Sequence, residues 1–255
     1  MDLGLDGKRV LVGGGAGGIG GGIAGVLAAE GARLVLVGRT AGTLEARGAE
    51  LGAGTCVADL STREGPRSAV ADAVGQLGGL DLLVVNSGGP PPGTFEAIGE
   101  EDWERAIEGT LQSTLRLIRA ALPHLRDASE PAIVINLSSS VREPLPGLTT
   151  SNVLRPGLAG LIKNLAFEIV PIRINGVAPG RFDTARVAQL DGKRAETSGQ
   201  SIEEVRREAE ARIPLGRDGD TTEIGRVAAF LLSPAASYVT GAIVPVDGGL
   251  VRALP

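Results

Sequence analysis

The stretch that decides the fold is Gly13-Gly14-Gly15-Ala16-Gly17-Gly18-Ile19-Gly20, which follows the apolar run Arg9–Val12 directly. An amphipathic stretch of helix length, Gly20–Glu30, comes next, so the glycines stand between a predicted strand and a predicted helix. Backbone without side chains can approach a pyrophosphate closely, and the helix N-terminus offers free N–H groups and a positive dipole end. This context, more than the glycines alone, predicts a dinucleotide-binding turn.

Short apolar runs alternate with amphipathic stretches over the rest of the chain. The longer of these stretches include Glu100–Leu125 and Gly157–Val170. The alternation is typical of an α/β fold of the Rossmann type, with a doubly wound, mostly parallel sheet and helices on both faces. No fixed repeat or low-complexity linker interrupts it, so we interpret residues 1–255 as a single domain. The seven expected strands are Arg9–Val12, Arg33–Val37, Gly54–Ala58, Leu80–Val85, Ala132–Leu137, Arg173–Val177 and Ala242–Val246.

Composition excludes several classes of protein. Hydrophobic residues make up 43% of the chain and aromatic residues 2%, so the core must consist of Val, Leu, Ile and Ala. The net charge of −5, with both signs interspersed, argues against a nucleic-acid partner. The start of the chain lacks a signal-peptide pattern, and no apolar run approaches the roughly 20 residues of a membrane span. We therefore expect a cytoplasmic protein without a membrane partner, and a buried, unreactive Cys56.

The least regular part of the sequence is the segment of about 181–220, which follows the sixth predicted strand. It contains a charged stretch, Ser201–Arg212, that we expect to be helical. Ligands of doubly wound sheets bind beyond the carboxyl ends of the strands. Two interpretations of the segment stay open, a mobile lid over the substrate and a plain solvated surface helix.

The end of the second predicted strand bears on the choice of cofactor. An Asp or Glu at this place would bind the 2′-hydroxyl of the adenosine ribose and repel a 2′-phosphate. The sequence is instead Val37-Gly38-Arg39-Thr40, and the planar guanidinium of Arg39 suits a phosphate. It predicts NADP(H) in preference to NAD(H), the other interpretation of Arg39 being an ordinary surface arginine.

Over almost its whole length the chain resembles the short-chain dehydrogenase/reductase family. Gly14, Gly18 and Gly20 match the three glycines of the family's Thr-Gly-x-x-x-Gly-x-Gly motif, with Gly13 in the place of Thr. The chain most resembles the members described as 3-oxoacyl-[acyl-carrier-protein] reductases. The other matching motifs are Asp59-Leu60, Val85-Asn86-Ser87-Gly88, Val177-Ala178-Pro179-Gly180 with Thr184, and the tail from Tyr238-Val239-Thr240-Gly241 to Val246-Asp247-Gly248-Gly249.

The resemblance implies an oxidoreductase that interconverts a carbonyl and an alcohol of a small molecule by hydride transfer. It also implies a homo-oligomer, a dimer or a tetramer. No metal is expected, because no His, Cys or carboxylate cluster has metal-ligand spacing. The expected cofactor contacts are Gly14, Gly18, Ile19, Gly20, Arg39, Asp59, Leu60, Asn86, Ser87, Gly88, Arg155, Pro179, Gly180 and Thr184.

The catalytic positions are where this sequence departs from the family. Its chemistry uses an Asn, a Ser and a Tyr-x-x-x-Lys pair. Here Thr110 falls at the Asn position, Ser151 at the Tyr position and Arg155 at the Lys position. For the serine, strand context favours Ser139, although loop spacing fits Ser138 equally well. Three of the four positions therefore differ.

These changes have unequal physical consequences. Arg155 keeps a positive charge and donors for ribose hydroxyls, but it cannot release a proton. Ser151 is a far weaker acid than a phenol of pKa about 10, and a neighbouring charge shifts a pKa by only about 1–3 units. The usual proton transfer should thus be crippled. Because proline is tolerated mainly in a helix's first turn, we also expect a helix to start near Pro156, leaving both residues on a loop.

No other residue is expected to replace the missing acid. We interpret Tyr238 as a packing residue, His124 as a solvated helix-end residue and Lys163 as solvent-facing. Two functions stay open. One is an NADP(H)-dependent oxidoreductase with atypical proton delivery, such as a water relayed by Ser139 and Ser151. The other is a cofactor-binding protein without turnover, acting as a sensor or a partner subunit.

Overall fold

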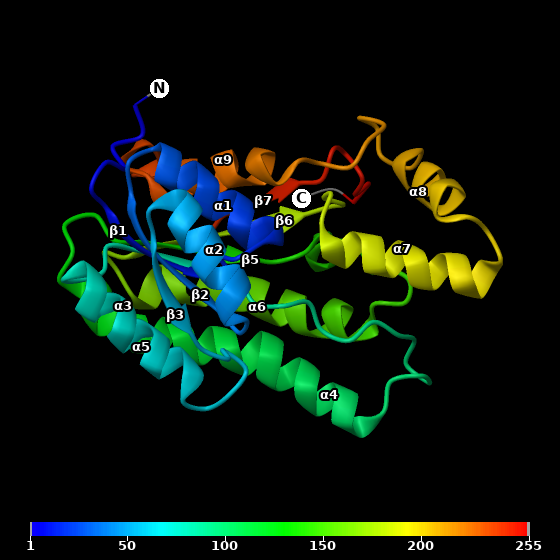
Figure 1. Ribbon diagram of the computed structural model, residues 1–255, viewed down its shortest axis with the longest axis horizontal. Helices are drawn as coiled ribbons and strands as arrows, with labels where there is room; N and C mark the ends of the chain where they lie inside the picture. The colour runs from blue at the N-terminus through cyan, green and yellow to red at the C-terminus, as the bar shows by residue number, and fades with distance from the viewer. Residues whose placement is uncertain (1, 254–255) are drawn as a thin grey trace.

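Seven parallel strands form a sheet in the order β3-β2-β1-β4-β5-β6-β7 in the computed structural model, which describes residues 2–253 (Figure 1). Every neighbouring pair is parallel. The predicted Rossmann-type fold is therefore confirmed. The strands are β1 (Arg9–Gly13), β2 (Arg33–Gly38), β3 (Gly54–Val57), β4 (Leu82–Val85), β5 (Ala132–Asn136), β6 (Arg173–Pro179) and β7 (Ile243–Val246).

Helices cover both faces of the sheet, because successive strand residues point to opposite sides. Val10 and Val12 of β1 belong to one core with α1 (Gly18–Ala29), α2 (Ala41–Leu51) and α9 (Thr221–Leu232). Leu11, between them, belongs to the other core. That second core also holds residues of α3 (Gly65–Leu77), α5 (Ser113–Arg126) and α6 (Thr149–Glu168). Figure 1 shows these two helical layers on either side of the sheet.

The strand order places a switch point between β1 and β4. The chain runs outward from β1 through β2 to β3, and then returns to the other side of β1 as β4. At such a point the connections leave the carboxyl edge in opposite directions, which opens a crevice for a ligand. The glycine-rich turn follows β1 at this edge, so the topology puts it at the expected ligand site.

Two expectations about packing have different outcomes. Cys56 is buried, as predicted, and burial raises the pKa of its thiol to about 12. Tyr238, interpreted as a packing residue, is instead fully exposed. Its neighbours make the contacts in its place, since Thr240 accepts a hydrogen bond from the Ile174 N–H and the Val239 carbonyl accepts one from Asn175. None of the helices within residues 2–253 has both the length and the apolar character needed to cross a membrane.

The helices α1 and α9 lie in direct backbone contact (Figure 1). A Cβ on Gly22 of α1 would lie 2.4 Å from the Thr221 carbonyl oxygen. A Cβ on Gly225 of α9 would lie 2.8 Å from the Gly22 oxygen. Both atoms would clash with backbone, which cannot move away as a flexible side chain can. The two glycines therefore set the distance between the helices.

This contact predicts opposite effects for two Gly→Ala changes. Gly22→Ala should destabilise the protein by about 1–3 kcal/mol, because it forces the helices apart. Gly75→Ala, in the exposed last turn of α3 with no atom within 4 Å of its Cβ, should stabilise it by about 0.5–1 kcal/mol. Urea unfolding followed by circular dichroism gives both values. Equal effects of the two changes would contradict the packing argument.

Candidate functional site

The glycine-rich turn forms a narrow cradle before α1. Gly14 and Gly18 have φ angles of 59° and 53°, which favour glycine. A Cβ on Gly20 would lie 2.2 Å from the Gly14 oxygen, so the turn closes only without a side chain there. The N-cap residue, Gly17, provides no side-chain cap, and Gly17 and Gly18 are exposed. The N–H groups of the first helical turn are thus open to an anion.

A chain of hydrogen bonds runs from this turn to α6. Asn86, after β4, donates to the Gly13 carbonyl at 3.0 Å. Asn136, at the end of β5, donates to the side-chain oxygen of Asn86 at 2.8 Å. Arg155 on α6 donates in turn to the Asn136 carbonyl. The turn and the catalytic candidate Arg155 are therefore held in fixed relation by side chains from two neighbouring strand ends.

Ser151 and Arg155 both lie on α6, four residues apart, with Pro156 inside the helix. The prediction that the helix starts near Pro156, with both residues on a loop, is wrong. The family's one-turn spacing between these two positions is thus retained in this chain. Both side chains are buried, Ser151 at 6% and Arg155 at 5% exposure.

Contacts with two loops explain why the helix extends ahead of Pro156. The Asn152 side chain bonds the backbone of Leu145 twice, accepting from its N–H at 3.0 Å and donating to its carbonyl at 2.9 Å. The Thr150 hydroxyl donates to the Pro91 carbonyl at 2.9 Å. These bonds, visible only in the fold, offset the roughly 3 kcal/mol that proline costs inside a helix.

A third serine, which the sequence did not single out, contacts Ser151. The hydroxyl oxygens of Ser140 and Ser151 lie 3.1 Å apart, and both residues are buried. The strand β5 is followed by a short 3-10 turn, η2 (Ser139–Val141), which rotates the serines relative to one another. Ser138 caps this turn by accepting from the Ser140 N–H, and Ser139 is 3% exposed. The pattern of strand residues does not reveal this turn, so the sequence could not show that Ser140 faces Ser151.

Arg155 is a buried cation without a carboxylate partner. Burial lowers the pKa of its guanidinium, and the charge of Arg186 lowers it further, to about 10. The group therefore stays protonated at neutral pH. Its Nε has no hydrogen-bond partner among residues 2–253, and the same holds for the buried Thr110 Oγ1 and Asn136 Oδ1.

Thr110 lies on a π-helical segment, η1 (Ile107–Gln112), between α4 (Glu100–Ala106) and α5. The stretch expected as one helix, Glu100–Leu125, is therefore interrupted. Such widened turns are frequent at functional sites. The segment packs on α6, the helix that carries Ser151 and Arg155.

Arg39 is exposed just beyond the end of β2 and forms no ion pair within the described part of the chain. It lies beside Asp59, which follows β3. Burial raises the pKa of Asp59. Hydrogen bonds from the Ser61 N–H and hydroxyl lower it, as does the charge of Arg39, and together they outweigh burial, so the net shift is downward. Asp59 is thus an anion that Arg39 approaches without binding it directly.

The remaining candidates also follow strand ends at this carboxyl edge. Gly180 donates its N–H to the Val246 carbonyl at 3.0 Å, which joins the ends of β6 and β7. The Thr184 methyl lies 3.8 Å from where a Cβ on Gly18 would be. The structure therefore gathers the expected contacts along one edge of the sheet: Gly14, Gly18, Ile19 and Gly20, then Arg39, Asp59 and Leu60, then Asn86, Ser87 and Gly88, and finally Pro179, Gly180 and Thr184.

The segment after β6 forms two helices, α7 (Ala185–Ser198) and α8 (Ile202–Glu210), which confirms the helix expected at Ser201–Arg212. The helix α8 is not fully solvated, because Val205 and Ala209 are buried. Its N-terminus carries a capping box formed by Ser201 and Glu204. The segment therefore packs through an apolar face, as a covering element does.

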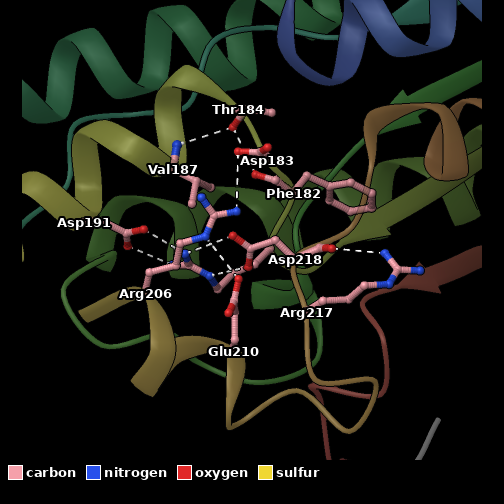
Figure 2. A network of polar contacts seen from close by, with 10 residues as sticks. Phe182, Asp183, Thr184, Val187, Asp191, Arg206, Glu210, Arg217 and Asp218 are labelled. Carbon is pink, nitrogen blue, oxygen red and sulfur yellow. Dashed lines mark hydrogen bonds and ion pairs between the residues drawn. The ribbon is translucent and has the colours of Figure 1, made fainter. Parts of the chain in front are cut away.

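Two buried carboxylates, Asp191 and Asp218, lie at the base of this segment (Figure 2), and Arg181 forms an ion pair with each. Its guanidinium donates to Asp191 on α7 at 3.0 and 2.9 Å, and to Asp218 beyond α8 at 2.8 and 3.2 Å. Burial lowers the pKa of Arg181, but the two carboxylates raise it more. Both ends of the segment are thereby tied to one residue next to β6.

Asp191→Asn should loosen the segment without unfolding the protein. It removes one of the two buried charges that balance Arg181, at a cost of about 1–3 kcal/mol. We expect faster cleavage within residues 185–215 in limited proteolysis, with the rest of the chain intact. The control is Glu208→Gln, which breaks an exposed pair with Arg194 worth at most about 1 kcal/mol. Equal cleavage of the two variants would contradict the clasp.

Comparison with known proteins agrees with this geometry. Residues 14–251 match the family model described as enoyl-(acyl carrier protein) reductase. The chain is 36% identical to nodulation protein G of Rhizobium sp. (strain N33), over 96% of this chain and 98% of that protein. It is 32% identical to the 3-oxoacyl-[acyl-carrier-protein] reductase FabG of Thermotoga maritima, over 97% and 99% respectively.

Solved structures show the same arrangement. L-sorbose reductase from Gluconobacter frateurii, complexed with NADPH and L-sorbose, superposes with a TM-score of 0.94. The two chains are 29% identical, and the match covers 100% of each. With the glycine cradle, the strand order and these relatives together, the chain belongs to the short-chain dehydrogenase/reductase family of oxidoreductases.

Proposed function

We propose that this chain is an NADP(H)-dependent oxidoreductase that interconverts a carbonyl and an alcohol. The observation that carries the proposal is the glycine cradle, in which a Cβ on Gly20 would lie 2.2 Å from backbone, with the unpaired Arg39 beside it. A cradle this tight admits a pyrophosphate to the helix N-terminus, and a free guanidinium suits a 2′-phosphate. The NADPH bound to the Gluconobacter frateurii reductase supports the same assignment.

The residues present fit the whole length of the cofactor. Gly14 and Gly18–Gly20 would hold the pyrophosphate, Asp59 and Leu60 the adenine, and Asn86–Gly88 the adenine ribose. Arg155, whose buried Nε lacks a partner, offers donors to the nicotinamide ribose at the far end. When bound, the nicotinamide supplies or accepts the hydride.

The proton path runs through hydroxyls. We assign Ser151 the hydrogen bond to the substrate oxygen, because it stands one helical turn before Arg155. Ser140 orients the Ser151 hydroxyl through their 3.1 Å contact, and Ser139 offers a second donor at the end of β5. The fixed charge of Arg155 stabilises negative charge that develops on that oxygen. A solvent molecule must replace the proton, because neither serine is a strong enough acid to act alone.

The segment of about 181–220 acts in this proposal as a lid with a fixed base. Arg186 on α7 donates to the Pro90 carbonyl at 2.7 Å, so α7 reaches across to the loop after β4. The clasp at Arg181 holds the base of the segment, and α8 is the part that opens and closes in this proposal. We also propose that the chain assembles as a homo-oligomer, a dimer or a tetramer.

Arg39→Gln tests the choice of cofactor. The change removes the charge that would pair with the 2′-phosphate and leaves the glycine cradle intact. We expect NADPH to bind at least about tenfold more weakly, a loss of about 1.4 kcal/mol, while NADH binding stays within a factor of two. Fluorescence titration of both nucleotides gives the values. Tighter binding of NADH than NADPH by the unaltered protein would overturn the assignment.

The double change Ser151→Tyr with Arg155→Lys tests the proton path. It restores the acid of pKa about 10 and the ammonium group that family members use, on a helix already in the required geometry. We expect kcat for reduction of ethyl acetoacetate by NADPH to rise at least about 100-fold, within the range that general acid catalysis provides. A chain that binds NADPH but turns over in neither form is the cofactor-binding protein without activity. Ordinary family rates in the unaltered protein would contradict the atypical path.

A further inference from the structure

Two arginines of the candidate site, Arg155 and Arg186, lie near enough for their charges to interact and have no acidic partner among residues 2–253. Arg155 on α6 is buried, and Arg186 in the first turn of α7 is half-buried. No carboxylate acts on the pKa of either group. In the segment that carries Arg186, four arginines have a carboxylate partner, Arg181, Arg194, Arg206 and Arg217, and the two others, Arg207 and Arg212, are exposed.

Arg186 contacts the loop that follows β4. Its Nη2 donates to the Pro90 carbonyl at 2.7 Å. The next carbonyl of that loop, at Pro91, accepts from Thr150, which directly precedes Ser151 on α6. The loop is therefore held between α7 and the start of α6. Arg186 and Thr150, the residue before Ser151, therefore bond to neighbouring carbonyls of the same short loop.

The charges are uncompensated within the described part of the chain. Burial lowers the pKa of the Arg186 guanidinium, and the charge of Arg186 lowers that of Arg155, so the two groups repel each other. Unpaired buried charge is costly, and a bound anion offsets that cost. The bond to Pro90 is the one hydrogen bond that Arg186 donates among residues 2–253. Its remaining N–H groups have the fork geometry that matches an oxyanion.

We propose that Arg186, with Arg155 behind it, binds a compact oxyanion carried by the substrate, such as a carboxylate. The substrate is then an anionic carbonyl or alcohol compound rather than a neutral ketone or sugar. This inference rests on the proposed function, because that function makes the ligand beside Ser151 the substrate. The alternative source of the anion is a phosphate of the cofactor, and the experiment distinguishes the two.

The probes are acetoacetate and its ethyl ester, which share a ketone and differ in charge. Their dissociation constants are measured by ligand-observed NMR at constant ionic strength, with and without saturating NADP⁺. We expect the protein to bind acetoacetate at least about tenfold more tightly than the ester. Arg186→Gln should reduce this preference below about threefold. Acid and ester share the ketone, so a purely structural role of Arg186 would weaken the binding of both and leave their ratio unchanged.

The matched control is Arg207→Gln, an exposed arginine on α8 in the same segment, which should keep the full preference. Equal binding of acid and ester by the unaltered protein would overturn the inference, as would a preference that survives Arg186→Gln. A third contrary result would be a loss of NADPH affinity in Arg186→Gln as large as its loss of acetoacetate affinity, because this would assign the arginine to cofactor phosphates. Failure of NADPH to bind the unaltered protein overturns the proposed function separately, since the acid-to-ester ratio is also read without cofactor.

Discussion

The space that Gly14 and Gly20 leave empty is filled by the side-chain amide of Asn86. A Cβ on either glycine would lie within 2.6 Å of that amide nitrogen, so the amide occupies a volume that no other residue type leaves open. Through this contact the first strand, the fourth strand and the start of α1 are held at one point. The Asn136 and Arg155 side chains continue the same chain of bonds to α6. The glycine cradle and the candidate residues on α6 thus both depend on the close approach of Asn86 to Gly14 and Gly20.

The fold could be predicted because its signals are local. Runs such as Arg33–Val37 read as buried strands whatever surrounds them, and a glycine cluster between strand and helix has few structural alternatives. The placement of Arg39 next to that turn also follows from chain order alone. The strand ends then had to meet at one edge, since all seven strands are parallel.

The parts that could not be predicted depend on contacts between distant segments. Pro156 sits inside a helix because Asn152 and Thr150 are bonded to loops that the sequence does not place beside them. Ser140 reaches Ser151 through a short turn that no periodicity reveals. Tyr238 stands exposed because neighbouring Val239 and Thr240 make the bonds to β6. In each case tertiary structure overrides a local preference.

If Ser151 and Arg155 act as proposed, the site differs from one built on tyrosine and lysine mainly in how charge is arranged. A phenol paired with an ammonium group can exchange a proton internally, whereas serines beside a guanidinium can only pass one along. Positive charge is therefore permanent here, at Arg155 and again at Arg186. In the segment 181–220 the opposite holds for Arg181, because two carboxylates pair with its positive charge. An arginine held by two carboxylates, Arg181, and one without a carboxylate partner among residues 2–253, Arg186, thus lie within one short stretch of chain.

The contact of Gly22 with Thr221 has a consequence for the order of folding. Gly22 and Thr221 are far apart in the sequence. The helix α1 therefore gains its neighbour α9 only after the residues between them have been synthesised. Contacts of such long sequence separation form late, since a large loop must close first. The nucleotide cradle at the head of α1 is therefore completed among the last parts of the molecule. A chain truncated before α9 would therefore leave α1 without its closest neighbour and the glycine cradle without that support.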